Sequence, residues 1–211
     1  SVILWSVGNE TIEQRKAPQK GIQWYRELIA LTRKEDPTRE VTCAMHPGGD
    51  QVPSNMIFLS PVVSYNYRTD SFAAWHQEYP NMIWIASETK AYNKKWIHDY
   101  EKIRYHDNSW QEMAPFIAGQ FIWAGIDYLG ESMGWPDRGF RHGLLRSTGK
   151  VKPYAWYTGS IYAEEPMVRL AVVDPFLVDS LNNLKSWQRT WAGAPVVRHW
   201  TFSHDTADKR V

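Results

Sequence analysis

Apolar runs rich in β-branched and aromatic residues recur along this chain, each about as long as one strand. They cover residues 1–10 (SVILWSVGNE), 41–46 (VTCAMH), 61–67 (PVVSYNY), 82–88 (MIWIASE) and 120–127 (QFIWAGID). In the first of these runs neighbouring residues are apolar, rather than every second one, so we expect this strand to be buried on both faces, as in parallel sheets.

Helical patterns lie between these runs. Apolar residues recur at helical spacing from Ile22 onward, and Pro37 disfavours helix in the residue before it, which predicts a helix over about 19–35. Shorter helices are expected over 71–79 and 152–163. Strands that alternate with helices predict a parallel sheet with crossover helices.

Five strands are too few to close a (β/α)8 barrel, which takes about 250 residues, and the chain has 211. We therefore expect an α/β fold, a partial (β/α)8 TIM barrel over residues 1–163. Residues 164–211 are irregular in pattern and predict a linker or the start of a following β-sandwich region. A half barrel leaves two sheet edges and an apolar face uncovered, which predicts self-association or pairing with the missing half.

Composition excludes several kinds of partner. The chain has 24 basic and 23 acidic side chains and a net charge of +1, which gives no electrostatic reason to expect nucleic acid or a membrane surface. No segment reaches the roughly 20 apolar residues of a membrane span. Cys43 is the only cysteine, lies in an apolar run, and is expected to pack in the core.

Aromatic residues are abundant, with 12 Trp and 11 Tyr. Their flat faces stack on the apolar faces of sugars, while their N–H and O–H groups bind hydroxyls. An aromatic-rich core is the alternative explanation, and for any single Trp it is the better expectation.

Two carboxylates, Glu10 and Glu88, end two of the predicted strands. The carboxyl ends of parallel barrel strands surround one pocket, where catalytic residues collect. A pair of carboxylates is the machinery of glycoside hydrolysis, and their separation decides between retention, at about 5–5.5 Å, and inversion, at roughly 6.5–9.5 Å.

Other strand ends carry groups suited to a sugar. Asn9 precedes Glu10, Tyr65 and Tyr67 end a third strand, and Trp123 lies near the end of the last. His46 ends the second strand and is a candidate to line the same pocket. No histidine pair has the spacing of a metal site, so we predict neither a metal site nor a cofactor.

In order, SVILWSVGNE, WIASE and GQFIWAGIDYLGE resemble the catalytic barrel of glycoside hydrolase family 2, the β-galactosidase and β-glucuronidase family, particularly its β-galactosidase-like enzymes from gut Bacteroidetes. The resemblance covers about residues 1–170 and implies strands 4 to 8 of the barrel. Relatives of this kind are often periplasmic, although the compartment of this chain is not readable from its sequence. Some relatives recruit Mg²⁺ or Na⁺ near the site, and no motif here indicates such an ion.

The resemblance implies a retaining double displacement. Glu10 matches the general acid/base of the family and Glu88 matches its nucleophile. Asn9 matches the residue that binds the sugar 2-hydroxyl, Tyr67 the tyrosine beside the nucleophile, and Trp123 the platform under the sugar.

Two further carboxylates, Asp127 and Glu131, follow on the last loop and are candidates either for sugar contacts or for structural salt bridges. The parent protein is expected to be a retaining exo-β-glycosidase of the β-galactosidase type that acts on a β-linked glycoside. β-Glucuronidase, β-mannosidase and a non-catalytic carbohydrate-binding remnant stay open as alternatives. The chain alone is expected to be inactive, because half of the sugar subsites are missing.

Overall fold

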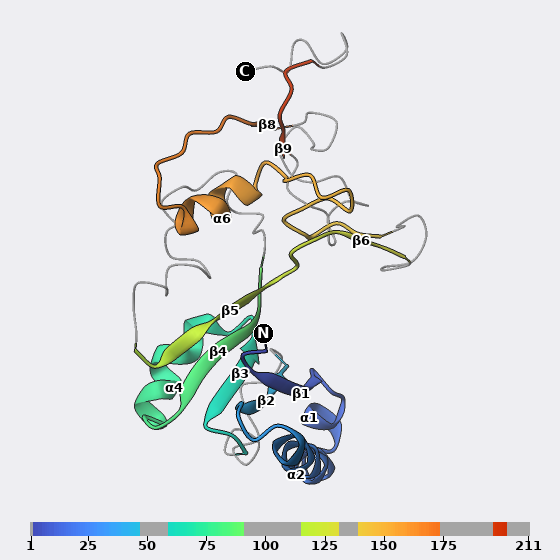
Figure 1. Cartoon of the computed structure of the whole chain (residues 1–211), viewed down its shortest axis with the longest axis vertical. Helices are drawn as coiled ribbons and strands as arrows, with labels where there is room; N and C mark the ends of the chain where they lie inside the picture. Colours follow the sequence, from blue (N-terminus) through green and yellow to red (C-terminus); the bar gives the residue numbers. More distant parts are fainter. Residues whose placement is uncertain (1, 47–58, 91–114, 131–138, 174–195, 202–211) are drawn as a thin grey trace. The chain divides into compact units, whose positions relative to one another are not determined.

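The computed structural model describes residues 2–46, 59–90, 115–130, 139–173 and 196–201. The chain divides into two compact units (Figure 1). The first unit comprises residues 1–89 and 100–122, and the second comprises residues 90–99 and 123–211. Each unit is described by itself below.

A five-stranded sheet forms the first unit, in the order β1-β2-β3-β4-β5. The strands are β1 (Trp5–Asn9), β2 (Val41–Met45), β3 (Val62–Asn66), β4 (Ile83–Lys90) and β5 (Ile117–Trp123). The pairs β1/β2, β2/β3 and β3/β4 are parallel. Spatial order therefore follows chain order, and the described connections β1–β2 and β3–β4 contain helices, as in a (β/α)8 barrel. The expected partial barrel is confirmed.

Helices connect these strands (Figure 1). Between β1 and β2 lie α1 (Glu13–Lys16) and α2 (Pro18–Glu35), and between β3 and β4 lie a 3₁₀ turn (Thr69–Ser71) and α4 (Phe72–Glu78). The helix expected over 19–35 is confirmed as α2, which ends where Asp36 takes an extended conformation before Pro37. Its buried stripe, Ile22, Tyr25 and Ile29, packs in the core of the sheet.

Large aromatic side chains fill the core beneath β3 and β4. Trp84 and Phe72 are each 1% exposed, and their ring centroids lie 5.6 Å apart. The Trp75 ring lies 5.4 Å from that of Trp84 and 4.7 Å from that of Tyr65. Aromatic pairs at such distances stabilise the fold by more than their buried area alone. This packing fixes β3, β4 and α4 relative to one another and so positions the residues at the strand ends.

The expectation that the first strand is buried on both faces is wrong for β1, whereas the middle of the sheet is buried throughout. All five residues of β2 and of β3 are buried. In contrast, Ile3 is 70% exposed and Trp5, the first residue of β1, is 38% exposed. β1 lies at one end of the strand order, so among the described strands it has a neighbour, β2, on one side alone.

The last strand of the sheet begins earlier than expected. The apolar run predicts a strand over 120–127, whereas β5 spans Ile117–Trp123. Gly119 interrupts the sequence pattern, because glycine is depleted in strands. In the structure Gly119 has φ 149°, a conformation that favours glycine, and the strand continues through it.

Short elements make up the described part of the second unit. They are α6 (Ala155–Tyr162), the antiparallel pair β6 (Tyr128–Leu129) and β7 (Gly139–Phe140), and the antiparallel pair β8 (Val172–Val173) and β9 (Val196–Val197). α6 agrees with the helix expected over 152–163. The expected domain boundary near residue 164 stays a prediction.

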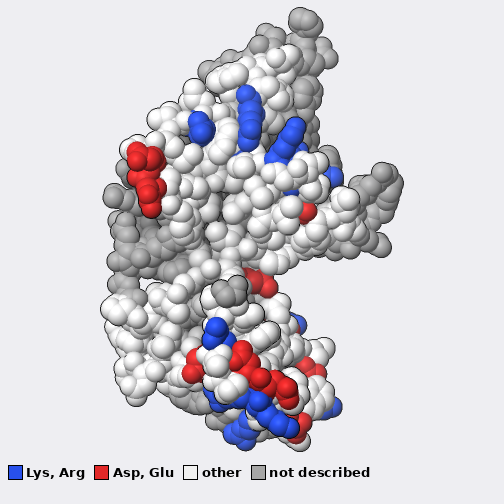
Figure 2. All heavy atoms as spheres, in the orientation of Figure 1, with Lys and Arg blue, Asp and Glu red and all other residues white. Residues whose placement is uncertain are grey.

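Charged residues of both signs share the surface of the first unit. Figure 2 shows Lys and Arg beside Asp and Glu on the face that carries α2. This mixture agrees with the near-neutral net charge of +1. Within the part of the chain that the structure describes, no helix has both the length and the apolar character needed to cross a bilayer.

Candidate active site

Glu10 follows β1 directly and has an unusual backbone conformation. Its φ is 48°, in the left-handed region that non-glycine residues rarely adopt. Such a conformation costs about 1–3 kcal/mol and persists only where surrounding contacts hold it. One such contact is the Glu10 N–H, which donates to the Ala44 carbonyl of β2 at 3.1 Å.

Gln14 ties the segment after β1 to the end of β2. Its Nε2 donates to the Ala44 carbonyl at 2.9 Å, and its Oε1 accepts from the His46 N–H at 2.7 Å. Gln14 Nε2 also donates to the Tyr25 hydroxyl of α2 at 3.0 Å. Gln14 is only 7% exposed, so these bonds fix the ends of both strands from within the protein.

Asn66, the last residue of β3, links the ends of β1 and β4. Its Nδ2 donates to Asn9 Oδ1 at 2.9 Å and to Glu10 Oε1 at 2.8 Å. Its Oδ1 accepts from Ser87 Oγ of β4 at 2.6 Å. Asn66 is 0% exposed, so the side-chain amide that bonds Glu10 is fully buried.

Tyr67, the next residue, holds the second carboxylate. The Tyr67 hydroxyl donates to Glu88 Oε2 at 2.6 Å, and the Tyr67 N–H donates to the Glu88 carbonyl at 2.8 Å. Tyr67 also has a left-handed backbone, with φ 56°. Two consecutive residues at the end of β3 therefore contact the two carboxylates that sequence reasoning selected.

The surroundings of both carboxylates leave them partly accessible. The Glu10 side chain is 28% exposed, and Glu88 is half-buried. The His46 ring lies nearby, with its Nε2 3.7 Å from Glu10 Oε2. The structure thus groups Asn9, Glu10 and His46 around Asn66, and it places Glu88 against Tyr67, the next residue of the chain. Joint action of the two carboxylates on one substrate stays a prediction.

Tyr65 is the candidate that the structure does not bring to these carboxylates. Its side chain is 3% exposed and packs in the core against Trp75. Burial raises the pKa of Tyr65 to about 12. Alternation along β3 explains this, because Tyr65 and Asn66 point to opposite faces of the strand.

Trp123 lies in an aromatic cluster of the second unit. Its ring centroid is 4.1 Å from that of Phe140, in an edge-to-face arrangement, and 6.4 Å from that of Tyr128. The His142 ring completes the cluster at 6.3 Å. The role of Trp123 as a sugar platform stays a prediction.

Asp127 makes a buried ion pair. Lys152 Nζ donates to Asp127 Oδ1 at 2.5 Å, and the Gly143 N–H donates to the same oxygen at 2.9 Å. The Asp127 and Lys152 side chains are 15% and 9% exposed. Burial lowers the pKa of Lys152, and the Asp127 carboxylate acts in the opposite direction. Of the two expectations for Asp127, the structure shows the salt bridge, while Glu131 lies outside the described residues.

Sequence reasoning missed Asn66 and Ser87. Both are short polar residues inside strand patterns, and their neighbours Tyr67 and Glu88 drew attention first. The signal for Asn66 was available, because a polar amide at the end of a wholly buried apolar run must find hydrogen-bond partners. Which partners it finds depends on strand register, and the register pairs Asn66 with Glu88.

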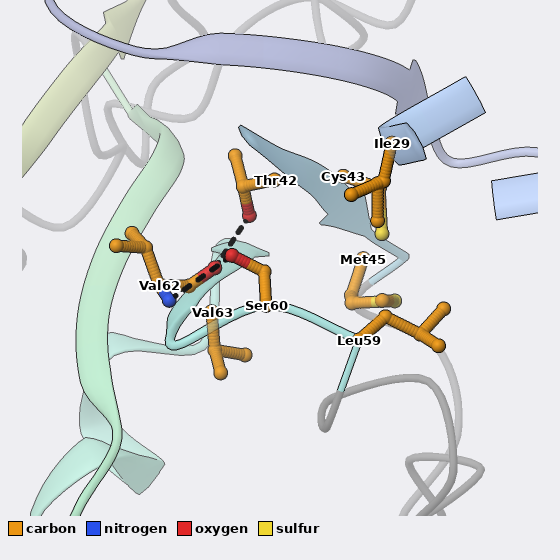
Figure 3. A pocket seen from close by; sticks show the side chains of 8 residues that line it. All are labelled: Ile29, Thr42, Cys43, Met45, Leu59, Ser60, Val62 and Val63. Carbon is orange, nitrogen blue, oxygen red and sulfur yellow. Dashed lines mark hydrogen bonds between the residues drawn. The ribbon is translucent and has the colours of Figure 1, made fainter. Parts of the chain in front are cut away.

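A small cavity of about 10 Å³ lies elsewhere in the first unit (Figure 3). Thr42 Oγ1 donates to the Val62 carbonyl at 2.7 Å, and the Val62 N–H donates to Ser60 Oγ at 3.3 Å. Cys43 also lines the cavity, and burial raises the pKa of its thiol to about 12. A water molecule needs about 10–15 Å³, so this space belongs to core packing rather than to a ligand site.

Among the described residues, no group of three or more His, Cys, Asp or Glu side chains is arranged to hold a metal ion. The prediction of neither metal nor cofactor stays untested.

The known proteins that this chain resembles are glycoside hydrolases. Residues 1–59 match the model of the glycosyl hydrolases family 2, TIM barrel domain. The chain is 21% identical to β-galactosidase BoGH2A of Bacteroides ovatus and 25% identical to a β-glucuronidase of Bacteroides fragilis. Each alignment covers 81% of this chain and 28% of the relative.

Solved structures agree with these relatives. A glycosyl hydrolase family 2 member from Bacteroides cellulosilyticus superposes with a TM-score of 0.74 at 27% identity. That superposition covers 97% of this chain and 26% of the other. The chain thus spans little more than a quarter of the length of these relatives.

Proposed function

Because residues 1–59 match the family 2 barrel model and the relatives named above are β-galactosidase and β-glucuronidase enzymes, we propose that this chain is a fragment of the catalytic barrel of a glycoside hydrolase of family 2. We propose that the whole enzyme is a retaining exo-β-glycosidase of the β-galactosidase type. One observation carries the proposal. Glu10 and Glu88, at the ends of β1 and β4, are held by the consecutive residues Asn66 and Tyr67 of the strand between them.

In the proposed first step, a Glu88 carboxylate oxygen attacks the anomeric carbon while the bond to the leaving group breaks. Glu10 delivers its proton to the departing glycosidic oxygen, and Glu88 becomes a glycosyl ester. The Tyr67 hydroxyl, bound to Glu88 Oε2, orients the carboxylate so that its other oxygen forms the new bond.

In the second step a water molecule attacks the same carbon and the ester bond to Glu88 breaks. Glu10, now ionised, accepts a proton from that water. Two displacements at one carbon restore the original configuration. Neither residue is consumed, and both return to their starting protonation states.

The sugar-facing roles follow the same scheme. We propose that Asn9 binds a substrate hydroxyl and that His46, beside Glu10, lines the pocket. The glycone is the least constrained feature, because one relative is named a β-galactosidase and another a β-glucuronidase. β-Glucuronide and β-mannoside are therefore the competing substrates.

The isolated chain is proposed to be inactive and to self-associate or to pair with the rest of the barrel. Exposed apolar residues at and before β1, including Ile3 and Trp5, support an uncovered edge. Residues 164–211 are proposed to lead into a β-sandwich region. Sedimentation of the isolated chain as a sharp monomer with cooperative unfolding would contradict the proposed self-association.

Covalent trapping tests the proposed function. The full-length enzyme, treated with 2,4-dinitrophenyl 2-deoxy-2-fluoro-β-galactoside, should gain the mass of one fluorosugar on the peptide that contains Glu88. The Glu88→Gln variant, treated identically, should gain none. A protein that binds galactosides without acquiring the label would be a carbohydrate-binding remnant instead.

A further inference from the structure

The Asn66 side-chain amide has a fixed direction. Its two N–H groups point to Asn9 Oδ1 and Glu10 Oε1, and its oxygen accepts from the Ser87 hydroxyl. Turning the amide over would place its oxygen against the oxygens of Asn9 and Glu10. Such a reversal would leave buried polar groups unpaired in a side chain that is 0% exposed.

This direction makes the two oxygens of Glu10 unequal. Oε1 lies 2.8 Å from Asn66 Nδ2 and accepts an N–H from it. A protonated carboxyl group has one carbonyl oxygen, which accepts, and one hydroxyl oxygen, which carries the proton. The oxygen that faces a fixed N–H donor is favoured as the carbonyl, so the proton belongs on Oε2.

We propose that Asn66 is a positioning residue that keeps the transferable proton of Glu10 on Oε2, the oxygen on the His46 side, and holds Oε1 as a permanent acceptor. Ser87 contributes by holding Asn66 Oδ1. This inference rests on the proposed function. It adds which oxygen of Glu10 acts and which residues of β3 and β4 select that oxygen.

Each step balances with Oε2 as the reacting oxygen. When the glycosidic bond breaks, the Oε2 proton moves to the leaving oxygen, which keeps the bonding electron pair, and Glu10 becomes a carboxylate. When water attacks the glycosyl ester, a water proton moves to Oε2 and the pair of the broken ester bond returns to Glu88. Asn66 exchanges no proton, and its bond to Oε1 persists throughout.

The test is made in the full-length enzyme with two substrates that differ in their need for a proton. Phenyl β-galactoside has a basic leaving group that depends on acid assistance, whereas 2,4-dinitrophenyl β-galactoside leaves with little assistance. Asn66→Ala should lower kcat/KM for the phenyl substrate about 100-fold, the lower end of the range for general acid catalysis. It should lower kcat/KM for the dinitrophenyl substrate less than about 10-fold, because its leaving group needs little proton transfer.

Two further variants keep the test decisive. Ser87→Ala removes one contact of Asn66 and should shift the substrate ratio in the same direction by a smaller factor. Thr42→Val is the matched control, because Thr42 is a buried hydroxyl of the same sheet that bonds the Val62 carbonyl (Figure 3). It should leave the substrate ratio unchanged whatever it does to stability.

The outcomes separate the inference from the function beneath it. If the wild-type enzyme is active and Asn66→Ala loses equal activity on both substrates, or loses none, the inference alone is overturned. If Asn66→Ala does not fold, an unchanged ratio in Ser87→Ala overturns it. A wild-type enzyme inactive on β-galactosides, β-glucuronides and β-mannosides overturns the proposed function and this inference with it.

Discussion

Each unit of this chain contains a partly buried polar network, and the two networks differ in the charge of the donors that bond their carboxylates. In the second unit, Asp127 meets a full positive charge on Lys152 and a backbone N–H on the same oxygen. In the first unit, the bonds described to Glu10 and Glu88 come from neutral groups, the Asn66 amide and the Tyr67 hydroxyl. Among the described residues, each neutral donor bonds one oxygen of its carboxylate, and His46 Nε2 lies 3.7 Å from the other Glu10 oxygen.

We propose that this difference separates a carboxylate that stabilises the fold from one that takes part in catalysis. Removing one partner of a buried ion pair leaves the other charge buried without compensation. A carboxylate held at one oxygen by a neutral donor has a fixed direction and keeps a reactive atom. Removing the partner should therefore cost stability in the second unit, whereas removing the carboxylate should cost activity in the first.

The largest expected effect is that of Glu88→Gln on turnover in the full-length enzyme. Loss of the proposed nucleophile should lower kcat by about 10⁴-fold or more, as when one member of a catalytic set is removed. Steady-state hydrolysis of 4-nitrophenyl β-galactoside measures it. Thermal unfolding should change little, and a variant that keeps a tenth of the activity would contradict the role of Glu88.

The second effect concerns stability. Lys152→Met leaves the largely buried Asp127 carboxylate unpaired and should lower the free energy of unfolding by about 3–5 kcal/mol. The double variant Lys152→Met/Asp127→Leu should recover most of that loss, because no buried charge then remains. Urea unfolding of the full-length protein measures both, and equal losses in the two variants would show that the unpaired charge was not the cause.

A smaller effect is expected from Tyr67→Phe, which removes only the hydroxyl that binds Glu88 Oε2. Hydrogen bonds to charged groups contribute about 1.5–3 kcal/mol, which corresponds to roughly 10- to 100-fold in kcat/KM. Tyr79→Phe is a matched control, since that hydroxyl binds Glu78 at 2.6 Å on the exposed surface. Equal activities of the two variants would argue against a positioning role for Tyr67.

The smallest effect is expected at Gly8. A Cβ there would lie 2.8 Å from Tyr25 Cε1, so Gly8→Ala must displace the Tyr25 ring. Overpacking of this kind costs about 1–3 kcal/mol. Thermal unfolding should show a lower melting temperature for Gly8→Ala. An unchanged melting temperature would mean that α2 and Tyr25 move aside without loss of stability.

The elements of the sheet were predictable because local patterns determine them. The apolar runs predict the strands β2 and β3, and the helical spacing predicts α2. Glu10 and Glu88 were identifiable for the same reason, since they stand where strands end. The half barrel predicts two uncovered sheet edges, but the apolar run of residues 1–10 does not show by itself that its strand forms one of them, because burial depends on which strand lies beside it.

The network beneath the carboxylates depends on non-local geometry. Asn66 lies 56 residues from Glu10 in sequence and 21 from Ser87. Only strand order and register bring these side chains together. Tyr65 shows the same limit, because strand alternation turns it into the core while both of its chain neighbours, Ser64 and Asn66, lie on the opposite face.

The most direct test is a crystal structure of the full-length enzyme trapped with the 2-fluoro sugar. We expect an ester bond between Glu88 and the anomeric carbon, with the two carboxyl groups about 5–5.5 Å apart. Glu10 Oε1 should still accept from Asn66, with Oε2 turned toward the sugar. A sugar bonded to any other residue, or carboxyl groups roughly 6.5–9.5 Å apart, would contradict the retaining mechanism proposed for this site.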